Sequence, residues 1–306
     1  MSNSTPVIRG NSLYTIVYGP SWTNAEANSV KLGGHLISIQ DSPENSFALK
    51  TLDTQSIPIA WIGYRDHTGG GDGHDWEWIN GEASRYENWN TNRTHAPDAP
   101  EPNDTGTGRA AYAEIYGSKY DQLQEGSQDS GTWNDTINDD TTWGGRGKGI
   151  AEIPFIRRGD SAYVIVEGPT WEEAEANAVG LGGHLVTIND AEESEWLTKT
   201  FRDANKSPYP DTNANVDIYW NGLLLSDNSW RWSNGEPLDY TNWGYKAPWG
   251  NGDRGQFILE ADKNLTQPLW SDTDGKWNDM YNDLRYGGGW HGIAEIPLAP
   301  NNKPTG

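Results

Sequence analysis

Hydrophobic positions come in short alternating stretches along the chain, and polar, glycine-rich segments separate them. Residues 14–17 (Tyr-Thr-Ile-Val) predict a short strand, and Pro20-Ser21-Trp22 then predicts a helix start with Ser21 as the N-cap. The pair Gly33-Gly34 marks the end of that helix. Three residues of the predicted helix share one face: Trp22, Ala25 and Ser29.

The next segments repeat this alternation of short elements and loops. Residues 35–39 predict a half-buried strand, and Asp41-Ser42-Pro43-Glu44 predicts a second helix with Pro43 in its first turn. Further short strands are expected at 60–64, 113–116 and 150–153. Long polar loops inside a compact domain usually carry function. The pattern therefore predicts an α+β fold whose activity resides in its loops.

A second set of segments repeats the first in the same order. Leu32-Gly33-Gly34-His35-Leu36 recurs at 181–185, Trp133-Asn134-Asp135 at 277–279, and the segment 149–154 (Gly-Ile-Ala-Glu-Ile-Pro) at 292–297. The chain is thus a duplication of one unit of about 150 residues. We expect one domain at 1–155, a second at 156–298 with almost no linker before it, and a polar tail at 299–306.

Composition narrows the classes of partner. The 44 Asp and Glu against 22 Lys and Arg give a formal net charge of −22, which disfavours nucleic acid and anionic lipid as partners. Such acidity serves either solubility or the binding of hard cations. The 17 Trp and 14 Tyr supply large core side chains and argue against disorder, and the lack of cysteine excludes disulfides and thiol chemistry.

Targeting signals are not evident in the sequence. No apolar run approaches the ~20 residues that a membrane-spanning helix needs, so no membrane insertion is expected. The first residues lack the basic and then apolar pattern of a signal peptide. Two interpretations follow: a cytosolic chain, or a processed or excerpted part of an exported protein.

The ordered motifs resemble those of the C-type lectin family. Trp61-Ile62-Gly63 matches the core Trp-Ile-Gly motif of that family, with Trp220-Asn221-Gly222 as a looser counterpart. Glu101-Pro102-Asn103 and Trp133-Asn134-Asp135 follow in the family order. The resemblance covers nearly the whole chain and implies two tandem C-type-lectin-like domains. Each would have two helices, a small antiparallel sheet and a long ligand-binding loop.

The resemblance implies a calcium site in the first domain. Glu101, Asn103, Asn134 and Asp135 match family positions that bind both calcium and sugar, with a cis peptide before Pro102. The Glu-Pro-Asn order implies mannose- or glucose-type sugars, bound through neighbouring hydroxyls. Family members usually have a further Glu ligand shortly after the triplet, but residues 104–110 contain no Glu and include Arg109. Asp104, water or a residue from 117–131 could take the place of that ligand. At the positions where family members usually have disulfide-forming cysteines, this chain has small residues: Ser29, Ala178, Ala151 and Ala294.

Other polar residues leave alternatives open. The second domain reads Ala247-Pro248-Trp249 where the triplet belongs, so it is expected to have a structural or protein-contact role, or to stack Trp249 on a sugar. Asn138-Asp139 and Asn282-Asp283 are either auxiliary cation ligands or turn residues. His35 and His184 are expected to be packed or capped. Glu114 and Glu260 are interpreted as repeated structural residues.

Two functions compete. The first is calcium-dependent binding of glycans by an extracellular or cell-surface adhesion component; the second is a calcium-independent contact with a surface protein or within a matrix. No catalytic pattern stands out, so an enzyme is not expected. Single sugar sites of this kind are weak, and useful binding would need oligomers or a larger array.

Overall fold

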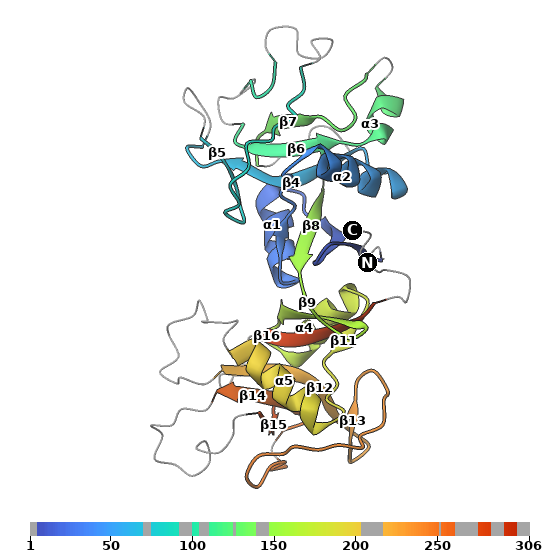
Figure 1. Ribbon diagram of the computed structural model, residues 1–306, viewed down its shortest axis with the longest axis vertical. Coiled ribbons are helices and arrows are strands. Elements are labelled where there is room, and N and C mark those ends of the chain that lie inside the picture. Colours follow the sequence, from blue (N-terminus) through green and yellow to red (C-terminus); the bar gives the residue numbers. More distant parts are fainter. Residues whose placement is uncertain are drawn as a thin grey trace. The chain divides into compact units, whose positions relative to one another are not determined.

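The computed structural model describes residues 5–69, 75–91, 100–103, 110–124, 127–138, 147–202, 217–250, 252–260, 275–282 and 291–298. The chain divides into two compact units, Met1–Pro154 and Phe155–Gly306 (Figure 1). No helix in these ranges is long and apolar enough to cross a membrane.

The first unit holds three helices and eight strands in its described part. The helices are α1 (Trp22–Lys31), α2 (Ser42–Thr54) and α3 (Ser118–Leu123). The strands are β1 (Val7–Arg9), β2 (Ser12–Tyr18), β3 (His35–Leu36), β4 (Ile59–Asp66), β5 (Trp76–Trp78), β6 (Tyr112–Tyr116), β7 (Trp133–Thr136) and β8 (Lys148–Pro154).

The second unit repeats this order without a counterpart of α3 among its described residues. Its helices are α4 (Trp171–Gly180) and α5 (Ala191–Arg202). Its strands are β9 (Ile156–Arg158), β10 (Ser161–Glu167), β11 (His184–Leu185), β12 (Asp217–Ser226), β13 (Ser229–Trp232), β14 (Arg254–Glu260), β15 (Lys276–Met280) and β16 (His291–Pro297).

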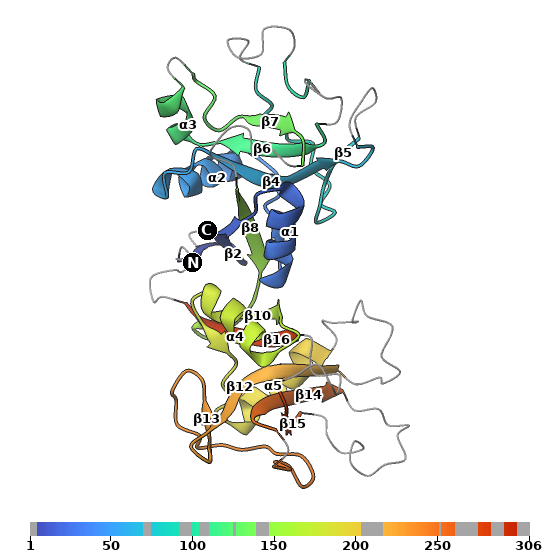
Figure 2. The ribbon, with the colours of Figure 1, turned by 180° about the vertical axis from the view of Figure 1, so that it is seen from behind.

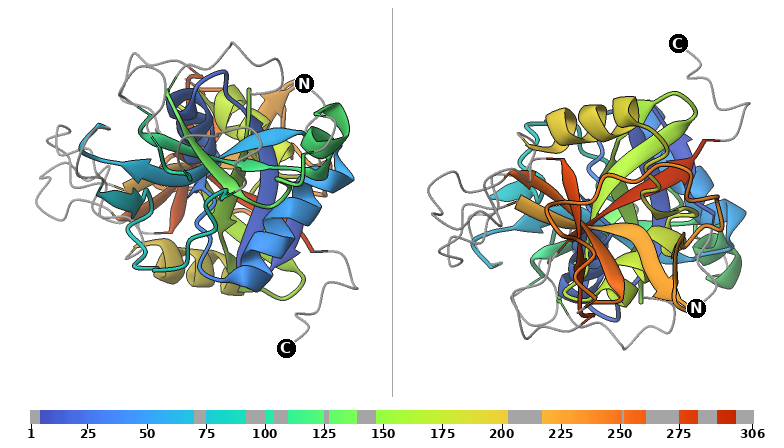
Figure 3. Two further views of the ribbon diagram at one scale, coloured as in Figure 1. Left: turned by 90° about the horizontal axis from the view of Figure 1, so that it is seen from above. Right: turned by 90° about the horizontal axis from the view of Figure 1, so that it is seen from below.

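Both sheets follow the same topology. The order in the first unit is β1-β2-β8-β4-β6-β7, with β3 on β8 and β5 on β4, and the second unit has the matching order β9-β10-β16-β12-β14-β15. The strands β4 and β8 pair in parallel, and the other described pairs in that sheet are antiparallel. The helix α1 lies beside β8 when seen from either side (Figures 1 and 2). Seen end-on, α2 and α5 each lie along one side of their own sheet (Figure 3).

The side chains at the predicted starts of the first two helices cap those helices in the structure. The Ser21 hydroxyl accepts the Asn24 N–H at the start of α1, and Asp41 caps α2 through the Glu44 N–H, with Pro43 in the first turn. Ser29, Ala151, Ala178 and Ala294, the positions where the family has cysteines, are all fully buried. Small side chains therefore fill the space between the first helix and the last strand of each unit.

One predicted strand is shorter in the structure. Within the expected strand 35–39, only His35–Leu36 is a regular strand. The residue that follows forms backbone hydrogen bonds with two different segments. The Ile37 N–H donates to the Ile150 carbonyl, while the Ile37 carbonyl accepts the Gly63 N–H. This segment therefore bridges β8 and β4 instead of continuing one ladder.

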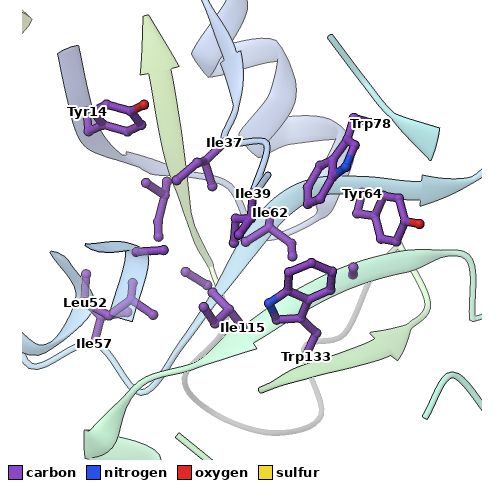
Figure 4. Close-up of a cluster of buried hydrophobic side chains, with 14 residues drawn as sticks. Tyr14, Ile37, Ile39, Leu52, Ile57, Ile62, Tyr64, Trp78, Ile115 and Trp133 are labelled. Carbon is purple, nitrogen blue, oxygen red and sulfur yellow. The ribbon is translucent and has the colours of Figure 1, made fainter. Parts of the chain in front are cut away.

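A core of aliphatic and aromatic side chains fills the first unit. Figure 4 shows Trp133 and Trp78 on one side of this core, with Ile37, Ile62 and Ile115 beside them. The two indole centroids lie 5.6 Å apart at 84°, an edge-to-face pair. Tyr86 and Trp89, in the described part of the segment between β5 and β6, pack against Trp133, which begins the strand that carries the polar residues described next.

Candidate functional site

Hydrogen bonds fasten the Glu-Pro-Asn segment to β7. The Glu101 N–H donates to the Asn90 carbonyl over 3.0 Å, and the Asn90 N–H donates to the Trp133 carbonyl over 2.8 Å. The Asn103 N–H donates to Asp135 Oδ1 over 3.0 Å. The Glu101–Pro102 peptide bond is cis, as the family resemblance implies. The structure therefore brings the two predicted motifs together at one place.

Two carboxyl groups meet at this place. Glu101 forms a hydrogen bond with the carboxyl group of Asp135, and burial, followed by that contact, raises the pKa of Glu101 to about 9. Glu101 Oε2 is buried and has no hydrogen-bond partner within the described residues. Carboxyl oxygens this close require a proton or a cation between them.

A buried carboxylate orients the neighbouring amide. Asn134 Nδ2 donates to Glu114 Oε1 over 3.0 Å and to the Asp135 carbonyl over 2.9 Å. Because the amino group of Asn134 is directed into the protein, its amide oxygen is the atom left for a cation. Glu114 is fully buried on β6, and a charged residue in an otherwise apolar strand is the sequence signal for such a role.

The interpretation of Glu114 and Glu260 as a repeated pair is wrong. Glu114 lies opposite Asn134 in the ladder, and the residue opposite Asn278 is Gln256. Glu260 lies opposite Asp217 instead. The second unit therefore has a neutral amide where the first has the orienting carboxylate.

The donor set of the first unit fits a hard cation. Glu101 and Asp135 offer carboxylate oxygens, while Asn103 and Asn134 offer amide oxygens, which are the ligand types that calcium prefers. Calcium takes about six to eight oxygens, so these four side chains leave positions for water or other groups. No cluster of three or more acidic, His or Cys side chains able to hold a metal is found in the described ranges. Asp104 and Arg109 lie outside the described residues.

The paired Asn residues have structural contacts. Asn138 Oδ1 accepts the Thr23 N–H over 3.0 Å, and Asn282 Oδ1 accepts the Trp171 N–H over 2.8 Å. Each amide thus holds the first turn of α1 or α4, which favours the interpretation as turn residues over cation ligands for these two. Asp139 and Asp283 lie outside the described residues.

His35 and His184 each pair with a carboxylate. His35 Nδ1 lies 2.5 Å from Glu26 Oε1, and His184 Nδ1 lies 2.7 Å from Glu175 Oε1. The hydrogen bond to Glu26 raises the pKa of His35 above its ordinary value. These contacts tie the strand after the helix back to the helix, as expected for capped residues.

The second unit keeps the backbone of this site but changes its ligands. The Trp249 N–H donates to Asp279 Oδ1 over 2.6 Å, as the Asn103 N–H does to Asp135. The Ala247–Pro248 bond is cis, like Glu101–Pro102. Ala247 and Trp249 therefore take the places of Glu101 and Asn103, and neither side chain supplies an oxygen.

Known proteins similar to this chain share one domain type. The family model for the lectin C-type domain matches twice, at residues 19–141 and 167–284. The secretory phospholipase A2 receptor of Bos taurus is 25% identical over 295 residues, which are 87% of this chain and 17% of the receptor. The C-type mannose receptor 2 of Mus musculus is 24% identical over 275 residues, which are 85% of this chain and 16% of that receptor. The chain thus spans about a sixth of the length of these relatives.

Shorter relatives and solved structures match parts of the chain. The regenerating islet-derived protein 3-beta of Mus musculus is 36% identical over 95 residues, which are 29% of this chain and 54% of that protein. The carbohydrate-recognition domain of the mouse scavenger receptor C-type lectin is 24% identical with a TM-score of 0.35, over 47% of this chain and 94% of that one. Since the family model covers most of both units, the chain belongs to the C-type lectin domain family and carries two tandem copies of that domain.

Proposed function

We propose that the first unit binds calcium and, through it, glycans of the mannose or glucose type. The observation that carries this proposal is the pair of facing carboxyl groups, Glu101 and Asp135, with a buried Glu101 oxygen that lacks a hydrogen-bond partner within the described residues. When bound there, calcium supplies a positive centre that sugar hydroxyls can coordinate.

The side chains of the site would then recognise the sugar directly. A carboxylate has two oxygens and an amide has an oxygen and an NH₂ group, so Glu101 offers an acceptor and Asn103 a donor beside the cation. Two neighbouring hydroxyls of one sugar need this combination, because each hydroxyl both donates and accepts. Asn134, held by Glu114, would contribute its oxygen without having to reorient.

Location and valency follow from the same proposal. Two relatives that each align with more than four-fifths of the chain are receptors by name, and we infer that this chain too acts outside the cell or at its surface, in adhesion. A single shallow sugar site binds weakly, so we infer that adhesion depends on several copies of the chain. No enzymatic step is needed for this function.

A protein partner is the second candidate. The observation that favours it is the second unit, where Ala247 and Trp249 replace the ligand side chains of the first. A domain of this kind can bind protein without calcium, since a shared fold does not fix the ligand.

Retention on mannose-agarose tests the first candidate. The full chain is expected to bind in calcium and to elute with EDTA, and Glu101→Gln is expected to weaken retention at least tenfold because it removes a ligand charge. Glu77→Gln is the matched control, since Glu77 is half-exposed and contacts Arg65 on the neighbouring strand. Retention that is equal in calcium and in EDTA, or unaffected by Glu101→Gln, would favour the protein-contact function.

A further inference from the structure

The described part of the loop before β14 in the second unit is fastened to Asp279 by backbone hydrogen bonds. Asp279 Oδ1 accepts the Trp249 N–H, and Asp279 Oδ2 accepts the Gly252 N–H over 3.2 Å. A Cβ atom at Gly252 would lie 2.3 Å from the Met280 backbone nitrogen, so only glycine permits this approach. Both Asp279 oxygens are therefore engaged by the backbone of the loop.

The charge of Asp279 is compensated differently from that of Asp135. In the first unit Asp135 faces a second carboxyl group, Glu101, whereas the second unit has the uncharged Ala247 at the position before its cis-proline. Two backbone donors already compensate the buried negative charge of Asp279. These two hydrogen bonds hold the described part of the loop against β15 without a metal ligand from Ala247 or Trp249.

Exposed aromatic rings belong to this loop and to the end of the adjoining strand. The side chain of Trp249 is 44% exposed, Tyr245 is 57% exposed, and Tyr281, two residues after Asp279, is 42% exposed. The Lys246 ammonium lies 5.1 Å from the centre of the Tyr245 ring. Large rings left in water next to a rigid backbone are typical of a contact surface.

The size of this surface indicates the kind of ligand. At the observed exposures the three rings offer about 300 Å² of accessible area. A stable protein interface buries about 800 Å² per partner, with aromatic residues, Met and Arg enriched at its centre. Even taken together, these three rings fall well short of that area, whereas one exposed indole suffices to cover the face of a single sugar residue.

We propose that the second unit carries a calcium-independent sugar site in which the indole of Trp249 packs against a pyranose whose ring substituents are all equatorial. Such a ring presents only axial C–H groups on each face, so it is flat and apolar where it meets the indole. Hydroxyls at the ring edge then remain free for polar groups of the loop. The choice of a sugar as the ligand rests in part on the function proposed for the first unit, because the second unit has the same backbone arrangement at the corresponding place.

Saturation-transfer NMR of the full chain with cellotriose in EDTA tests this site. EDTA removes the calcium that the first unit would need, so any transfer reports on binding without metal. We expect transfer to the axial ring protons, reduced at least fivefold by Trp249→Ala and only partly by Trp249→Phe. The Trp249 N–H that bonds to Asp279 remains in both variants, so the loop keeps its anchor.

Two control variants separate this proposal from that for the first unit. Tyr18→Ala removes an aromatic side chain that is 60% exposed on β2 of the first unit, and Glu101→Gln/Asn103→Ala removes two proposed calcium ligands. Saturation transfer from both variants to cellotriose should equal that from the wild type, whether or not the first unit binds mannose. Absence of transfer with the wild type, or equal transfer with Trp249→Ala, would overturn the proposal.

Discussion

At the scale of single residues, Trp133 links the core of the first unit to its site. Its ring packs edge-to-face against Trp78, Tyr86 and Trp89, and its indole N–H donates to Asn45 Oδ1 over 2.8 Å. Burial of this side chain therefore fixes the next two residues of β7, which are the proposed ligands. Trp277 packs in the same way, but its indole nitrogen is buried with no partner within the described residues.

The amide of Asn45 should therefore contribute strongly to stability. Asn45→Ala leaves the buried Trp133 N–H without an acceptor and also removes the bond from Asn45 Nδ2 to the Gly131 carbonyl. A buried unsatisfied donor costs about 1–3 kcal/mol, so we expect a loss in this range in urea unfolding. Ser194→Ala is the control, because Ser194 corresponds to Asn45 in α5 and makes a 3.3 Å bond to the Gly275 carbonyl. Equal losses for the two variants would contradict this role.

At the scale of elements, the sequence predicted what local chemistry determines. The helix starts at Ser21 and Asp41 follow from side-chain caps a few residues away, and the family motifs follow the predicted order along the chain. The helix α3 was not predicted, because its start is held by Asp53, whose carboxylate accepts the Ser118 N–H and hydroxyl from 65 residues away. No local pattern encodes such a cap.

The candidate site was predictable to a similar extent. The motifs indicated Glu101, Asn103, Asn134 and Asp135, and the structure brings them together. The counterpart of Glu114 was misjudged because its identity depends on the register between β14 and β15, which a sequence comparison of the two units does not reveal. The bonds that tie Trp249 and Gly252 to Asp279 also depend on tertiary contact.

The junction between the first helix and the last strand should tolerate no side chain at Gly34. A Cβ atom there would lie 2.1 Å from the Glu152 carbonyl oxygen and 2.8 Å from Ile153 Cα. Both are backbone atoms, so Gly34→Ala must displace β8, and overpacking of this kind costs about 1–3 kcal/mol. Chemical denaturation measures the loss.

Gly10→Ala provides the comparison for this prediction. Gly10 has a φ of +61°, and a Cβ atom there would have no neighbour within 4 Å, so alanine meets conformational strain alone, about 1 kcal/mol. We expect Gly34→Ala to destabilise the protein more than Gly10→Ala. The reverse order would contradict the packing argument.

At the scale of the whole molecule, the charge of −22 is the dominant feature. Many like charges repel one another in the folded state and less so in the expanded unfolded chain, which lowers stability at low ionic strength. The two units differ in how they compensate buried carboxyl groups: in the first unit Glu101 and Asp135 share a hydrogen bond, and in the second unit backbone donors bond to Asp279.

Salt should therefore stabilise the metal-free protein. Raising the NaCl concentration from about 0.01 M to about 0.15 M shortens the Debye length from about 30 Å to about 8 Å and screens the repulsion. We expect a higher Tm by scanning calorimetry in EDTA, with choline chloride giving a similar gain because the effect is not specific to sodium. A Tm that stays constant or falls would show that repulsion does not limit stability.

A calcium titration by calorimetry tests the central claim most directly. The wild-type chain should bind calcium, and Glu101→Gln/Asn103→Ala should abolish that binding, because the variant removes one of the two facing carboxylates and one amide oxygen. Asp279→Asn in the second unit should leave calcium binding unchanged, since its carboxylate is already engaged by Trp249 and Gly252. Failure of the wild type to bind calcium at millimolar concentration would contradict the account.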